Sequence, residues 1–70
     1  MRKVAVHSLM VEPTGQSMEM VVIEMRDGIV TDYYPFTNEQ AQTEWIGGTV
    51  ILRKNEQGQL QAFKNNRLLC

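Results

Sequence analysis

Apolar and polar residues along the chain form short runs that are typical of β-strands. The first run, Lys3–Val11, is rich in β-branched side chains and has apolar residues at consecutive positions, as a strand covered on both faces does. The second run, residues 18–25, alternates with a period of two, which places Met18, Met20 and Val22 on one face. The N-terminal part therefore predicts two strands, separated by a turn that contains proline and glycine.

The clearest local signal is the dipeptide Asp27-Gly28 between two apolar runs. Asp-Gly favours a tight hairpin turn, because glycine adopts a positive φ without a steric clash of a Cβ. The returning strand covers residues 29–34 and ends at Pro35. Residues 18–34 are thus predicted to form a β-hairpin.

Residues 36–45 carry the signals of one short helix, roughly two turns long. Thr37 and Gln40 have the spacing of a capping box, in which each side chain bonds to the backbone of the other. So short a helix is marginal alone, so Phe36 and Trp45 are expected to anchor it by packing.

The remainder of the chain predicts three more strands after a glycine break at Gly47-Gly48, namely residues 49–53, 60–64 and 67–70. Gly58 and the pair Asn65-Asn66 supply the turns between them. The fold class is mostly β, a small sandwich or open barrel of about five to six antiparallel strands with one short helix. The arrangement favoured is two hairpins packed face to face, with the helix covering one end.

Length and composition predict one domain, residues 1–70, with a modest core. A chain of this size hides only about 60% of the surface that its unfolded form exposes. Its single cysteine, Cys70, has no partner for an intramolecular disulfide, and with the single histidine, His7, it cannot complete a zinc site. Because small domains that lack disulfides and structural metal ions often rely on association for stability, we expect a homo-oligomer or a protein partner.

No targeting segment is expected. The apolar stretch that follows the basic N-terminus is too short and too often interrupted for a signal peptide or a membrane span. One free thiol is typical of the reducing cytoplasm, so the prediction is a cytoplasmic protein with no membrane partner.

The net charge is −1, but basic residues gather in the C-terminal part, at Arg53, Lys54, Lys64 and Arg67. Such a basic patch attracts anionic partners, so weak binding to nucleic acid is one hypothesis. The interpretation preferred from the sequence is that these side chains are solvated residues of turns and edges, with nucleic acid not the main partner.

Candidate chemistry is sparse, and the sequence predicts no catalytic, cofactor-binding or metal site. His7 is the only histidine, and Ser8 beside it points to the opposite face of a regular strand. No cleft distinguishes any pair among the carboxylates from solvated charges; the ones considered are Glu24, Asp27, Asp32, Glu39 and Glu44. Gly47-Gly48 lacks the neighbours of a phosphate loop.

The methionines and aromatic residues are interpreted mainly as core residues, and an interaction face is the alternative interpretation. Methionine fills gaps in cores and also recurs on adaptable binding surfaces. Met18, Met20 and Met25 therefore form the predicted interaction face, if they lie exposed on a strand. Four of the five aromatic residues lie between positions 33 and 45, where anchoring of the predicted helix is preferred to stacking on bases.

Three features follow one another between Asp27 and Leu52. Asp27-Gly28-Ile29-Val30 opens a returning strand, Tyr34-Pro35-Phe36 ends it, and residues 45–52, Trp-Ile-Gly-Gly-Thr-Val-Ile-Leu, lead into another strand. This order is similar to the small β-sandwich that precedes the barrel of amidohydrolases and covers about a third of the chain. That family's His-x-His metal motif is missing, since no histidine follows His7. The resemblance implies a detached, non-catalytic β-module.

Three functions remain open from the sequence. The first is a non-catalytic binding or structural module that self-associates or docks on a larger protein. The second is an accessory subunit of a hydrolase-type enzyme, and the third is a weak nucleic-acid-binding domain. None of the three requires a cofactor.

Overall fold

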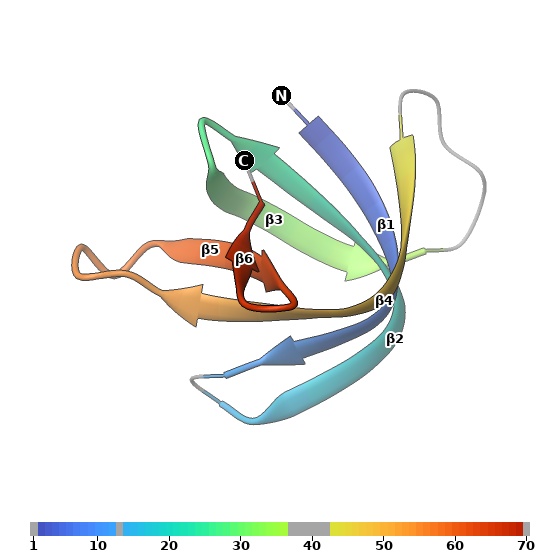
Figure 1. Cartoon of the computed structure of the whole chain (residues 1–70), viewed down its shortest axis with the longest axis horizontal. Coiled ribbons are helices and arrows are strands. Elements are labelled where there is room, and N and C mark those ends of the chain that lie inside the picture. The colour runs from blue at the N-terminus through green and yellow to red at the C-terminus, as the bar shows by residue number, and fades with distance from the viewer. Residues whose placement is uncertain (1, 13, 37–42, 70) are drawn as a thin grey trace.

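The computed structural model describes residues 2–12, 14–36 and 43–69. Within these residues the secondary structure consists of strands alone (Figure 1). The strands are β1 (Arg2–Val11), β2 (Gln16–Arg26), β3 (Ile29–Pro35), β4 (Thr43–Lys54), β5 (Leu60–Lys64) and β6 (Arg67–Leu68).

All six strands belong to one sheet with the order β3-β2-β1-β4-β5-β6. The sheet curls so strongly that β3 and β5, which are not paired, lie near each other, and the result is a half-barrel (Figure 1). The mostly-β, open-barrel prediction is confirmed. The preferred arrangement of two packed hairpins is replaced by this single curled sheet.

One strand pair differs from the expected antiparallel arrangement. β1 and β4 are parallel, whereas the other neighbours are antiparallel. The chain leaves β3 at one edge of the sheet and enters β4 on the far side of β1. Local turn signals fix hairpins only, so they cannot reveal a long crossover of this kind.

The predicted helix is wrong at its C-terminal end. Residues 37–42 lie outside the described part, but Thr43–Trp45 form the start of β4. At the other end, the Phe36 N–H donates a hydrogen bond to the carbonyl of Met20, a residue of β2, at 2.8 Å. Pairing of Trp45 with Ala5 of β1 provides the contact that decides the conformation here, and the local capping signals do not.

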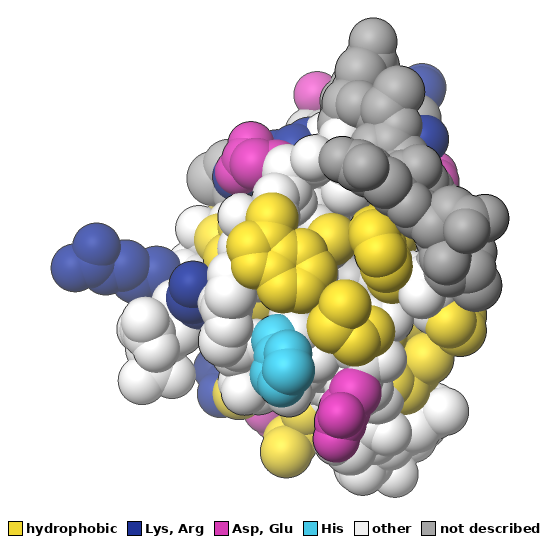
Figure 2. Space-filling view, turned by 90° about the vertical axis from the view of Figure 1, so that its right-hand side faces the viewer, with side chains coloured by type: hydrophobic (Ala, Val, Ile, Leu, Met, Phe, Trp, Pro, Cys, Tyr) yellow, Lys and Arg dark blue, Asp and Glu magenta, His cyan; other side chains and the backbone are white. Residues whose placement is uncertain are grey.

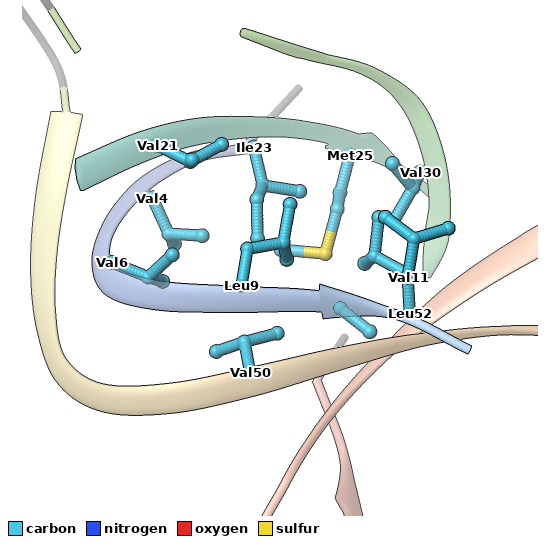
Figure 3. Close-up of a cluster of buried hydrophobic side chains, with 11 residues drawn as sticks. Val4, Val6, Leu9, Val11, Val21, Ile23, Met25, Val30, Val50 and Leu52 are labelled. Carbon is cyan, nitrogen blue, oxygen red and sulfur yellow. The ribbon is translucent and has the colours of Figure 1, made fainter. Parts of the chain in front are cut away.

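The concave face of the sheet holds the hydrophobic core, in which side chains from the strands meet inside the half-barrel (Figure 3). The fully buried members include Leu9, Ile23 and Leu52. Polar side chains take no part, since none in the described chain is buried. The cluster comprises Val4, Val6, Leu9, Val11, Val21, Ile23, Met25, Val30, Val50, Leu52 and Ala62.

β1 and β4 bend at the same place in the sheet. There the alternation of inward-facing and outward-facing residues shifts by one position. In β1 two residues separate the core positions Val6 and Leu9, where a regular strand would have one. In β4, opposite this point, the register with β1 shifts by one residue at Gly47-Gly48, as a β-bulge does. Gly48 has φ +87°, a conformation that side chains with a Cβ rarely adopt. Bulges of this kind increase the twist and bend a sheet into a barrel.

Two hairpin turns follow the sequence prediction. Asp27 and Gly28 both have positive φ, as the favoured two-residue turn requires, and they join β2 to β3. Asn65 and Asn66 repeat this conformation between β5 and β6. The expected strand pairings at these two turns are confirmed.

Candidate functional site

The convex face of the sheet carries an apolar row across four strands. Ala5 lies between two core residues of β1, so its side chain points outward. It pairs with Val22 of β2 and with Trp45 of β4, and Val22 pairs in turn with Tyr34 of β3. Ala5 and Val22 are buried in spite of their outward direction, whereas Trp45 is 55% exposed.

Met20 extends this row toward the bend. Met20 has φ +54° and lies two residues before Val22 along β2. The residues around it face the core, since Met18 packs against the core and Val21 belongs to it. The side chain of Met20 is 36% exposed. Figure 2 shows hydrophobic side chains gathered on this side of the molecule, next to the histidine and an acidic residue. We call Ala5, Met20, Val22, Tyr34 and Trp45 the tryptophan patch.

A second apolar row lies on the convex side beyond the bend. Met10 points outward between the core residues Leu9 and Val11. It pairs with Ile51, which pairs with Phe63, which pairs with Leu68. Met10 and Leu68 are 42% and 44% exposed. We call Met10, Ile51, Phe63 and Leu68 the methionine row.

The convex face therefore holds every large hydrophobic side chain that is exposed in the described residues: Met10, Met20, Trp45 and Leu68. Scattered exposed hydrophobic residues are normal on a protein surface, but a contiguous group marks an interaction site. The outer side of a curled sheet is expected to be polar where water covers it. This asymmetry makes the tryptophan patch the candidate functional site.

A polar rim borders the tryptophan patch on the β2–β3 side. The Tyr34 hydroxyl donates to Glu24 Oε2 at 2.5 Å. This hydrogen bond to a carboxylate, together with desolvation and the negative charges of Glu24 and Asp32, raises the pKa of Tyr34 to about 12. Lys3 pairs with Glu24 across the strands, but it forms no ion pair within the described chain. The rim thus carries both signs of charge.

The three methionines of the predicted interaction face do not share one surface. Met25 belongs to the core and is 1% exposed, and Met18 packs against the core from the inner side. Of the three, Met20 is the exposed one. The phase shift of β2 between Met18 and Val21 separates residues that a regular strand would place together.

The predicted basic patch is also divided. Arg53 Nε donates to Glu12 Oε2 at 2.7 Å, so its charge is already paired. Lys54 is the next residue along β4 and points to the other side of the strand. Lys64 and Arg67 pair with each other across the β5–β6 turn. A continuous basic surface of the kind that follows a nucleic-acid backbone is not formed by these four residues.

The remaining candidates lie apart from one another. His7 is exposed at the bend, where both it and Ser8 lie between the inward-facing Val6 and Leu9. Asp27 is in the β2–β3 turn, and Arg2 Nη2 lies 2.7 Å from Glu44 Oε2. Residues 2–12, 14–36 and 43–69 contain no group of three or more metal-ligating side chains in reach of one ion. Glu39 and Cys70 lie outside the described residues.

Two exposed residues of the convex face, Trp45 of the tryptophan patch and Met10 of the methionine row, are not predicted as surface residues from the sequence. Trp45 was expected to anchor a helix, and its true position depends on the parallel pairing with β1. Met10 follows Leu9 and precedes Val11, so the three consecutive apolar residues at the end of β1 are the available signal. Such a run indicates that both faces of the strand are apolar.

Comparison with known proteins adds no relative: no protein-family model, curated protein or solved structure matches the chain. The described residues also include no helix that has the length and apolar character to cross a bilayer. The convex face is therefore the feature from which a function is argued.

Proposed function

We propose that the chain is a non-catalytic binding module of the cytoplasm that self-associates through the tryptophan patch. The observation that carries the proposal is the exposure of Trp45 and Met20 beside buried Ala5 and Val22, on the side of the sheet opposite the core. Tryptophan and methionine are enriched at protein interfaces, and central tryptophans often contribute most of the binding energy.

A second copy of this chain is the occupant that the observations favour. A 70-residue chain with one cysteine has no disulfide of its own to strengthen a thin core. Covering the tryptophan patch removes further apolar area from water at about 25 cal/mol per Å². The rim carries Lys3 as well as the acidic residues Glu24 and Asp32. A rim with both signs can complement itself in a two-fold interface.

The test is size-exclusion chromatography with light scattering over a roughly hundredfold concentration range. Reductant is present throughout, because oxidation of Cys70 would also link two chains. The proposal predicts a dimer that dissociates on dilution. Trp45→Ser is expected to weaken it by at least about 2 kcal/mol, or roughly 30-fold in the dissociation constant.

Leu68→Ser is the matched control, since Leu68 is similarly exposed but belongs to the methionine row. It should leave the dimer of the tryptophan patch intact. If the chain stays monomeric over the whole concentration range, self-association is contradicted. Docking on a larger protein is then the remaining hypothesis. Equal weakening by the two variants contradicts the assignment of the interface to the tryptophan patch.

A further inference from the structure

The hairpin formed by β5 and β6 places two positive charges directly opposite each other. Lys64 and Arg67 flank the two-residue turn Asn65-Asn66 and pair across the strands, so their side chains leave the same face. Like charges in this position repel each other and destabilise a hairpin. Neither residue has an ion-pair partner in the described part of the chain. The face of the hairpin from which both side chains leave therefore carries two positive charges with no carboxylate partner among the described residues.

The same residues line an open hollow. Lys64, Asn65, Arg67 and Leu69 border an open space of about 590 Å³. Leu69 packs against the core and forms the apolar side of the hollow. The space has room for a small molecule with an attached anionic group and is larger than a single ion needs.

Gly48 of β4 positions the lysine. Lys64 Cε lies 3.5 Å, and Nζ 3.8 Å, from where a Cβ on Gly48 would be, so the lysine side chain lies across β4 at the bulge. This places the ammonium group beside the bend of the sheet, on the β4 side of β5. Lys64 follows Ala62 of the core by two residues, so the hollow opens on the concave side, away from the tryptophan patch.

We propose that this hollow is a binding site for the phosphate group of a small molecule. Arginine binds phosphate oxygens through two parallel N–H groups, and lysine adds a point charge. A phosphate monoester carries a charge of about −1.5 to −2 at neutral pH, which matches two cations, whereas a carboxylate neutralises only one. Asn65 beside the pair adds an amide that can donate to a third oxygen.

The experiment is a titration of the full chain with inorganic phosphate at constant ionic strength, followed by backbone amide chemical shifts. Saturable shifts are expected at residues 64–69 and at Gly48, with a dissociation constant of about 1–10 mM. Acetate at the same concentrations should give at least roughly tenfold weaker binding, because it carries one charge. Glycerol phosphate should bind at least as tightly as inorganic phosphate if the rest of the hollow also contacts the ligand.

Lys64→Gln and Arg67→Gln are each expected to weaken phosphate binding at least roughly tenfold. Lys54→Gln removes the same charge at the end of β4 and should change the affinity little. Phosphate should raise the melting temperature of the parent chain, and it should raise that of Lys64→Gln by much less.

Three results would overturn the site. They are linear, unsaturable shifts with phosphate, equal binding of acetate, and equal loss of affinity in Lys54→Gln and Lys64→Gln. Equal loss in both variants would mean that phosphate is attracted by the total positive charge of the protein and not by a particular site. Binding of a nucleic-acid backbone depends on charge in the same way.

Discussion

The two faces of the curled sheet differ in what covers their apolar residues. On the concave face, side chains such as Leu9 and Ile23 are fully buried by other strands of the same chain. On the convex face, Trp45 and Met20 border a similar apolar group, yet they remain exposed. Alternation along the strands produces both faces, but only the concave face is covered completely within the chain, since Trp45 and Met20 stay exposed beside buried Ala5 and Val22 on the convex face. The difference separates the residues that stabilise the fold from those available to a partner.

Neighbouring residues of β1 allow the sharpest test of this difference. Leu9 is 0% exposed on the concave face, and Met10 is 42% exposed on the convex face. Leu9→Ala leaves a cavity in the core and should lower the free energy of unfolding by about 2–5 kcal/mol. Met10→Ala should lower it by less than about 1 kcal/mol. Urea denaturation at a concentration where the chain is monomeric gives both values, and equal losses would remove the distinction between the faces.

The next largest effect is expected at the bend. Gly48 has φ +87°, so Gly48→Ala places a Cβ in the left-handed region and should cost about 1–2 kcal/mol. Gly47→Ala is the matched control, because nothing lies within 4 Å of a Cβ built at that position and its φ is not in the positive range. Thermal unfolding of the two variants should rank Gly48→Ala clearly below Gly47→Ala. The reverse order would contradict the proposed cause of the bend.

The polar rim can be examined through the ionisation of Tyr34, whose hydrogen bond to Glu24 raises its pKa to about 12. In the unfolded chain a tyrosine ionises near pH 10, so the folded state holds this proton more tightly. The stability from the hydrogen bond is therefore fully present below about pH 10 and is lost as the pH rises toward 12. Ultraviolet titration of a Tyr33→Phe variant isolates Tyr34.

Glu24→Gln should bring the pKa of Tyr34 back toward 10, because the amide removes the negative charge that the phenolate would face. Asp32→Asn is the matched control, since Asp32 contributes last among the causes of the shift. If the two variants have equal effects, the hydrogen bond is not the main cause.

The smallest effect is predicted for the ion pair between Arg53 and Glu12, which lie 2.7 Å apart at the surface. Exposed pairs of this kind contribute about 0–1 kcal/mol, and salt screens them. Glu12→Gln should therefore change the free energy of unfolding by less than about 1 kcal/mol. A larger loss in urea denaturation would indicate that polar contacts on the convex side stabilise the monomer as the core does.

Local signals in the sequence were enough for the hairpins and for most strands. Asp27-Gly28 and Asn65-Asn66 have positive φ and join the strands that were expected on either side. The run Lys3–Val11 indicated a strand with two apolar faces, and Ala5 is indeed buried on the outer side of β1. These features depend on a few adjacent residues, so one sequence can show them.

The arrangement of the strands and the site could not be predicted in this way. The parallel pairing of Trp45 with Ala5 joins residues 40 positions apart, and the capping signals near Thr37 favoured a helix. The phase shift between Met18 and Val21 is also hidden, because the run contains apolar residues in both phases. Such features come from the curl of the whole sheet, and no short window of sequence contains them.

The most direct test of the convex face as an interface is the fluorescence of Trp45, the only tryptophan of the chain, as a function of protein concentration. Trp45 is 55% exposed in the single chain, so a dilute sample should emit at long wavelength and be quenched readily by iodide. We predict a blue shift and protection from iodide over the concentrations at which light scattering detects the dimer. Association with unchanged emission and quenching would place the interface elsewhere and contradict the account.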